Sequence, residues 1–247
     1  MNFKIKEIKE LFKKGKRVLR EEGFLSLLKK SLFSCSMVYL YEERLDNDVS
    51  VPPCKLDNLT IKPLFIPTMT QFEYEAPGEE FFDFPSHPDA QEYVPGHKEI
   101  LNTGMLMLYV TANGEFVHRD SVCLSGRGNF YEYYYKKLQR KSTPPFYSLD
   151  DRQIAHRALC VTNPKYRNKG VFRHFYFEMH NFMRKEGFSK LVYTEYSDRI
   201  YLLKIVDELG AEAKFKVYNL KLLTLFNFMW LRPCTVSPLT ELGISGR

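Results

Sequence analysis

The segment from Cys160 to Phe172 combines residue types that bind anions at the start of a helix. It reads Cys-Val-Thr-Asn-Pro-Lys-Tyr-Arg-Asn-Lys-Gly-Val-Phe, a strand-like run, a turn containing Pro164, and then basic residues and Gly170. The first backbone N–H groups of a helix have no intrahelical acceptor, and together with the helix dipole they can cradle a pyrophosphate. Many strand-to-helix turns contain Arg and Gly, so the segment taken alone favours a structural turn over an anion site.

Regular elements are predicted on both sides of this segment. Apolar residues at positions 171, 172, 175, 179, 182 and 183 form one face of a helix that ends at Gly187. Together, the patterns after residue 150 predict a strand over 153–162, a helix over 171–186, a strand over 188–195, a helix over 198–209 and a strand over 211–225. This alternation is typical of an α/β chain.

The part of the chain before residue 150 shows strands and loops. Two runs, 105–110 and 115–124, flank Asn113-Gly114, which predicts a hairpin with a tight turn. Residues 59–64 alternate as a strand does, residues 89–101 indicate one or two helices, and residues 125–150 resemble an inserted lid. His118 and Asp120 on the hairpin are a candidate pair facing a substrate.

Over residues 59–225 the chain resembles the GNAT superfamily of acetyl-CoA-dependent N-acetyltransferases. The signature of that family is a strand ending in Val-x-Pro, followed by x-x-Arg-x-x-Gly-x-Gly or Ala at the start of a helix. Thr162, Pro164, Arg167, Gly170 and Phe172 occupy those places. The order of predicted elements also matches. Three positions depart from the pattern: Phe172 replaces a small residue, Val206 stands where many members have Tyr, and Arg199 lies near a preferred Asn.

The resemblance implies an α/β (α+β) fold with a mixed, twisted and splayed sheet flanked by helices, which we expect to contain about six or seven strands. In such a fold the strands 153–162 and 188–195 diverge, and the pantetheine arm of acetyl-CoA lies between them. The residues that the resemblance places at the cofactor are Cys160, Val161, Thr162, Arg167, Asn168, Lys169, Gly170, Val171, Phe172 and Arg173. No metal is implied.

The implied reaction is acetyl transfer to a primary amine of an unidentified acceptor, by direct attack on the thioester. A backbone N–H near residues 160–162 would polarise the thioester carbonyl. Proton transfer requires an acid and a base. The candidates are Glu195 and either Tyr196 or Tyr201, of which we select Glu195 and Tyr201 as the catalytic residues. Their structural alternatives are a solvated carboxylate at a strand end and an aromatic side chain packed on its helix.

Two other functions stay open at this point. The first is a catalytically weak or inactive GNAT-like module that binds CoA or a partner protein, which the absence of Tyr at Val206 favours. The second is a transferase of longer acyl chains at a membrane face, which the basic N-terminus favours. Acceptor specificity would lie in the segments 65–103 and 125–150, whose sequences predict no particular substrate.

The net charge of +6 is concentrated at the N-terminus. Residues 1–33 contain ten Lys or Arg and four Glu, so the rest of the chain is neutral. The apolar spacing in residues 5–19 predicts a basic amphipathic helix, and a second helical run is predicted over 24–41. Pro52-Pro53 marks a linker within 42–58. We therefore divide the chain into an extension, residues 1–58, and a GNAT-like domain, residues 59–247.

Charge confined to one segment does not favour nucleic-acid binding, which requires a basic surface on the folded domain. Docking of residues 1–33 on the domain or on a second subunit of a homodimer is the favoured interpretation. Peripheral contact with an anionic membrane is the alternative. Five widely spaced cysteines without a CxxC pair indicate reduced thiols and a cytoplasmic location.

Overall fold

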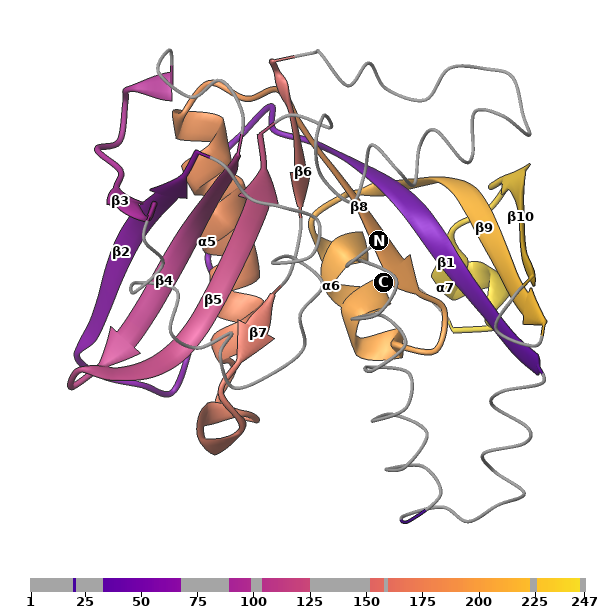
Figure 1. Cartoon of the computed structure of the whole chain (residues 1–247), viewed down its shortest axis with the longest axis horizontal. Coiled ribbons are helices and arrows are strands. Elements are labelled where there is room, and N and C mark those ends of the chain that lie inside the picture. Colours follow the sequence, from indigo (N-terminus) through magenta and orange to yellow (C-terminus); the bar gives the residue numbers. More distant parts are fainter. Residues whose placement is uncertain are drawn as a thin grey trace, which may run out of the picture.

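The computed structural model describes residue 20 and residues 33–67, 89–98, 104–124, 152–157, 160–222 and 226–244. Within these ranges the chain forms one ten-stranded sheet with the order β10-β9-β1-β8-β6-β5-β4-β2-β3, and β7 pairs with β5 beside this path (Figure 1). The sheet is mixed, because the pair β6 and β8 is parallel and the other pairs are antiparallel.

The strands before residue 124 form an antiparallel unit. It contains β2 (Leu59–Ile66), β3 (Gln91–Glu92), β4 (Met105–Ala112) and β5 (Glu115–Cys123). Asn113 and Gly114, with φ angles of 51° and 80°, make the tight turn between β4 and β5. The predicted hairpin and the first strand are confirmed. The helix expected near residues 89–101 is wrong at Gln91–Glu92, which pair with β2.

The predicted strand over 153–162 consists of two short strands, β6 (Ile154–Arg157) and β7 (Val161–Thr162). β6 pairs with β8 (Lys190–Tyr196) at Ile154–His156. Among the described residues, β7 has no partner besides β5. The two parallel strands are therefore hydrogen-bonded only near their starts, as expected for a splayed pair.

Two helices follow the strands as predicted and lie side by side (Figure 1). Helix α5 (Val171–Lys185) begins one residue after Gly170, and α6 (Ile200–Glu208) ends two residues before Gly210. Arg173 on α5 pairs with Glu208 on α6 at 2.6 Å. Both helices contribute to the same core cluster, α5 with Tyr176, Met179 and Met183 and α6 with Leu203 and Val206.

The largest difference from the sequence prediction lies before residue 45. Phe33–Arg44 forms β1, which is inserted between β8 and β9 and is antiparallel to both. The helix predicted over 24–41 is therefore wrong from residue 33 onward, and residues 42–44 are strand rather than linker. Tyr39, Leu40 and Tyr41 are buried, so part of the predicted extension lies inside the sheet. The amphipathic helix predicted over 5–19 lies outside the described residues.

The C-terminal part adds elements that the sequence did not predict. β9 (Glu212–Leu222) is followed by β10 (Phe226–Pro233) and the short helix α7 (Pro238–Glu241). With β1 and β10 the sheet has ten strands, so the expected six or seven was too few. The lid predicted over 125–150 lies outside the described residues. None of the described helices combines the length and the apolar character needed to cross a bilayer.

Candidate functional site

The turn before α5 presents a run of backbone N–H groups without acceptors. Among the described residues no hydrogen bond is formed by the backbone N–H groups of residues 168–173, and the first helical bond is donated by His174 N–H to Gly170 O. Asn168 and Gly170 have φ angles of 61° and 78°. Backbone N–H groups that lack acceptors at the start of a helix suit an anion, because the helix dipole adds to their positive partial charge. This turn is called the nest below.

Gly170 is required at the nest for two reasons that do not involve a ligand. Its φ of 78° is unfavourable for residues with a side chain. A Cβ atom at this position would also lie 3.3 Å from Pro53 O and 3.6 Å from Cys54 Cα. The chain itself therefore packs closely against this glycine, and the glycine alone is no argument for phosphate binding.

The strand that leads into the nest has one open edge. β7 pairs with β5 through His118 opposite Thr162 and Arg119 opposite Val161. Its other edge faces no strand among the described residues, so backbone groups of Val161 and Thr162 on that side can pair with an extended ligand. The Cys160 thiol donates to Asp120 Oδ1 at 2.8 Å. Burial raises the pKa of this thiol well above its ordinary value, so it is no nucleophile.

The basic residues around the nest differ in their partners. Arg167 is exposed and its Nε donates to Thr162 O at 3.3 Å. The Lys169 ammonium lies 5.4 Å from the centre of the Tyr166 ring. Arg173 is ion-paired with Glu208. Arg167 therefore keeps its terminal guanidinium nitrogens available for an anion held by the nest.

Phe172, where the family pattern has a small residue, is half-buried at the start of α5. Its ring stacks on Tyr176 at 5.4 Å and meets the edge of Tyr201 at 6.0 Å. Tyr201 remains 59% exposed. Burial is the main cause that raises the pKa of Tyr201, and the nearby Glu195 carboxylate adds to it. The nest, Phe172 and Tyr201 are thus brought together between the N-termini of α5 and α6.

Glu195 is buried near the end of β8, so its interpretation as a solvated strand-end carboxylate is wrong. Only 9% of its surface is exposed. Burial raises the pKa of Glu195 to about 7, against the opposing effects of the Tyr176 hydroxyl and the Arg157 guanidinium. Tyr176 donates to Glu195 Oε1 at 3.2 Å. A carboxyl with this pKa can accept and release protons near neutral pH.

A network of buried charges extends from this carboxyl into the core. Arg157 donates to Asp120 Oδ2 and to Tyr176 O, both at 2.6 Å, and its guanidinium lies 3.2 Å from the centre of the Tyr176 ring. It also lies 3.8 Å from Glu43 Oε2, which accepts a hydrogen bond from Tyr193 at 2.8 Å. The network fixes Tyr176, and through Tyr176 the position of Glu195.

Most members of this network were missed by the sequence interpretation. Asp120 and His118 were only a candidate pair for a substrate-facing site, and the structure buries both instead. Asp120 binds Arg157, while His118 bonds through Nδ1 to Thr162 Oγ1 at 2.9 Å and stacks on Phe175. Burial lowers the pKa of His118 to about 4, so this imidazole is neutral. The available signal was the presence of charged residues within strands that are otherwise apolar, among them Asp120 and Arg157.

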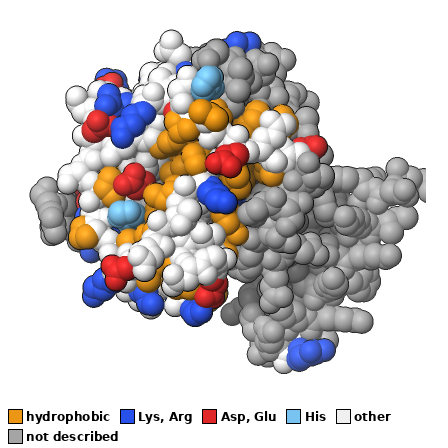
Figure 2. Space-filling model, turned by 90° about the vertical axis from the view of Figure 1, so that its left-hand side faces the viewer, with side chains coloured by type: hydrophobic (Ala, Val, Ile, Leu, Met, Phe, Trp, Pro, Cys, Tyr) orange, Lys and Arg blue, Asp and Glu red, His pale blue; other side chains and the backbone are white. Residues whose placement is uncertain are grey.

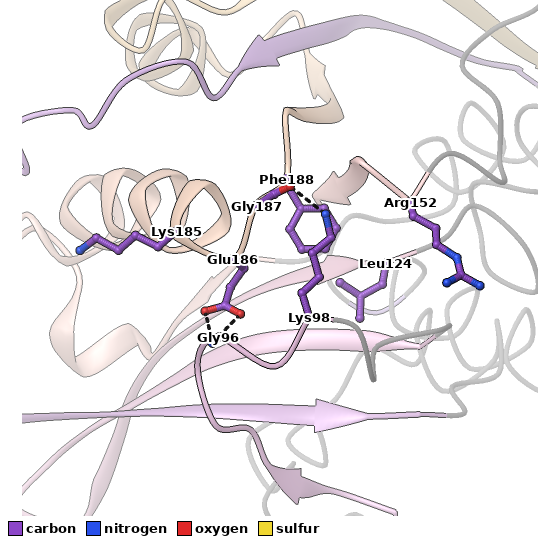
Figure 3. Close-up of a pocket in the computed structure, with 8 residues that line it drawn as sticks. All are labelled: Gly96, Lys98, Leu124, Arg152, Lys185, Glu186, Gly187 and Phe188. Carbon is purple, nitrogen blue, oxygen red and sulfur yellow. Dashed lines mark hydrogen bonds between the residues drawn. The ribbon is translucent and has the colours of Figure 1, made fainter.

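A separate cavity of about 390 Å³ lies at the opposite end of α5 (Figure 3). Its lining includes Lys98, Leu124, Arg152 and Phe188 but none of the residues predicted at the cofactor. The Lys98 ammonium donates to Gly187 O at 2.8 Å and lies over the Phe188 ring. Figure 3 shows Lys185 and Arg152 directed away from each other, so the cations of this cavity do not converge on one point.

The surface on the β2 side of the molecule carries both signs of charge. Figure 2 shows acidic and basic side chains interspersed there, with hydrophobic side chains exposed between them. Clustered positive charge is not seen on the described part of this face.

No protein-family model matches the sequence, and no curated protein matches it. Solved structures with a similar arrangement are found. One is a GCN5-related N-acetyltransferase from Kribbella flavida, with 14% identity and a TM-score of 0.40 over 80% of this chain and 63% of that chain. Another, from Sphaerobacter thermophilus, has 10% identity and a TM-score of 0.43 over 82% and 57%.

A tandem GNAT protein from the clavulanic acid biosynthesis pathway has 9% identity and a TM-score of 0.43 over 77% of this chain and 54% of that chain. The chain thus spans between about half and two thirds of the length of these structures. Likeness at this level does not assign an activity.

Proposed function

We propose that the chain is a GNAT-type N-acetyltransferase that transfers the acetyl group of acetyl-CoA to a primary amine of an acceptor. The observation that supports this most is the nest of residues 168–173, which lies directly after the open edge of β7. An anion-binding turn next to an unpaired strand edge suits a ligand that carries a pyrophosphate on an extended, amide-containing arm.

In this proposal each group of residues has a separate role. The N–H groups of the nest and Arg167 hold the pyrophosphate, and backbone groups of residues 160–162 pair with the pantetheine arm. An N–H of the same strand polarises the thioester carbonyl while negative charge develops on its oxygen. The amine attacks the thioester carbon directly, the C–S bond breaks, and the sulfur leaves as a thiolate.

Proton transfer in this reaction falls to Glu195 and Tyr201. Glu195 accepts the proton that the attacking ammonium must lose, because its pKa of about 7 leaves a substantial ionised fraction at neutral pH. Tyr201 is exposed beside the nest and, with its hydroxyl protonated at neutral pH, can supply a proton to the departing thiolate. Val206, the position where many family members have Tyr, is fully buried in the core.

Isothermal titration calorimetry with CoA tests the binding part of the proposal. We expect the wild-type protein to bind CoA and Arg167→Glu to bind it at least tenfold more weakly, because the variant places a negative charge beside the phosphates. The matched control is Lys204→Glu, which reverses the charge of an exposed residue on α6. This variant should bind CoA as the wild type does. Equal affinity of all three proteins would contradict the nest as the cofactor site.

A CoA-binding module without catalysis is the second candidate. The observation that favours it is Val206, a buried residue that stands where many family members have Tyr. Binding does not separate the two candidates. Release of free CoA thiol over a panel of amines does, with Glu195→Gln as the comparison. Amine-dependent release that falls in Glu195→Gln supports the transferase, and CoA binding without release under any amine supports the module.

A further inference from the structure

A segment that connects β1 to β2, residues 46–56, runs along α5 and ends at the nest. Its contacts begin at the C-terminal half of the helix and end at its first turn. Asn47 O accepts from His180 Nε2 at 3.0 Å, and Val49 bonds through both its N–H and its C=O to the Asn181 amide. Pro52 O accepts from His174 Nδ1 at 2.7 Å. This segment is called the strap.

The last contact of the strap lies at the nest itself. Lys55 N–H donates to Lys169 O at 2.8 Å, and the backbone of Pro53 and Cys54 packs against Gly170. These bonds fix the backbone of Lys55 beside the turn whose N–H groups lack acceptors. The strap is therefore one wall of the anion site, although it lies more than a hundred residues earlier in the sequence.

Besides Arg167, which the proposed function uses for the pyrophosphate, Lys55 is a cation near the nest, and its ammonium has no partner among the described residues. Lys55 is exposed. Its neighbours are engaged, since Lys165 pairs with Glu115 at 2.5 Å, Arg173 pairs with Glu208, and Lys169 lies over Tyr166. A lysine ammonium is a compact charge on a long flexible stem, suited to a phosphate that lies at some distance from its backbone.

CoA offers such a second phosphate. Besides the pyrophosphate it carries a monoester phosphate on the 3′ oxygen of the ribose, which dephospho-CoA lacks. Resting on the proposed function, we propose that Lys55 binds this 3′-phosphate while the nest holds the pyrophosphate. The strap thereby makes the site selective for CoA over dephospho-CoA. Selectivity comes from one additional charge-assisted contact, because the nest itself treats the two ligands alike.

Calorimetric titration of three proteins with both ligands tests this assignment. Lys55→Ala removes the ammonium but keeps the backbone N–H that bonds to Lys169 O. Lys62→Ala, an exposed lysine on β2, is the matched control. We expect the wild type and the control to bind CoA about tenfold more tightly than dephospho-CoA. Lys55→Ala should lose this preference and bind dephospho-CoA as the wild type does.

The outcomes separate this inference from the proposed function. Equal affinity of wild-type protein for the two ligands would overturn the role of Lys55 and leave the nest intact. So would a preference that persists in Lys55→Ala, or a loss that affects both ligands equally. Absence of binding of either ligand by the wild type would overturn the proposed function, and this inference with it.

Discussion

Glu195 differs from the other candidate residues in that its environment changes its protonation within the physiological range. Burial raises its pKa from 4.5 to about 7. Below pH 4.5 the carboxyl is protonated in the folded and the unfolded chain. Between pH 4.5 and pH 7 the carboxyl is ionised in the unfolded chain but still protonated in the folded chain. Rising pH therefore lowers the free energy of unfolding over this range, and above pH 7 the decrease is complete.

Replacement of Glu195 by Gln should remove this pH dependence, since the amide keeps an oxygen for the Tyr176 hydroxyl. Relative to wild type, we expect the free energy of unfolding of Glu195→Gln to increase by about 3 kcal/mol between pH 4.5 and pH 8. Urea unfolding of both proteins at the two pH values measures the difference. If the difference in free energy of unfolding between the two proteins is the same at both pH values, Glu195 ionises as an exposed carboxylate does.

The contribution of one N–H group of the nest can be isolated at Arg173. Arg173→Ala and Arg173→Pro both remove the side chain and its ion pair with Glu208, and the proline also removes a backbone N–H that forms no intrahelical bond. Proline is tolerated in the first turn of a helix. We expect Arg173→Pro to bind CoA about tenfold more weakly than Arg173→Ala in calorimetry. Similar melting temperatures would show that the helix is intact, and equal affinities would exclude this N–H as a ligand.

Among the elements, the strap depends on side chains of α5 for its place. Asn181 is 9% exposed and its amide satisfies both backbone groups of Val49. Asn181→Ala leaves these groups without their partner, so the free energy of unfolding should fall by about 2 kcal/mol in urea titrations. The exposed substitution Lys204→Ala should change it by less than about 0.5 kcal/mol. A neutral effect of Asn181→Ala would mean that the strap is held without this residue.

The predictability of each element followed from how local its determinants are. The start of α5, the turn at Asn113-Gly114 and the helix end at Gly210 were predicted because glycine, asparagine and apolar spacing act within a few residues. β10 was missed because residues 223–225, Leu-Thr-Leu, contain no turn residue. The strand of residues 153–162 was predicted as continuous because its division into β6 and β7 depends on pairing with β5 and β8.

The candidate site was predicted in part for the same reason. The residues that we propose at the cofactor follow one another in sequence, so a short motif was enough to indicate them. The network that positions Glu195 joins Glu43, Asp120 and Arg157 from three strands distant in sequence. A single sequence shows that these residues are charged, but it does not show which of them pair. The contacts of the strap with α5 could not be predicted either, since a segment that contains Pro52-Pro53 has the composition of an ordinary linker.

At the scale of the whole molecule, β1 connects the N-terminal region to the fold. A short apolar run such as residues 33–41 suits a buried helix or a buried strand equally well, and only the pairing with β8 and β9 decides between them. The free edges of β8 and β9 are both covered by this strand. Truncations that probe the N-terminal region must therefore stop before Phe33.

The last prediction concerns residues 1–32, which carry the net positive charge. If they dock on the domain or on a second subunit, deleting them should lower the melting temperature or change the mass measured by light scattering, because Ile5, Ile8 and Phe12 lose their apolar partners. We expect this result.

Contact with an anionic membrane would behave differently, since each basic side chain contributes about 1 kcal/mol near such a surface and salt screens the attraction. Co-sedimentation with anionic vesicles at low and high salt distinguishes the two. Salt-sensitive binding that disappears on deletion, with stability and mass unchanged, would contradict docking.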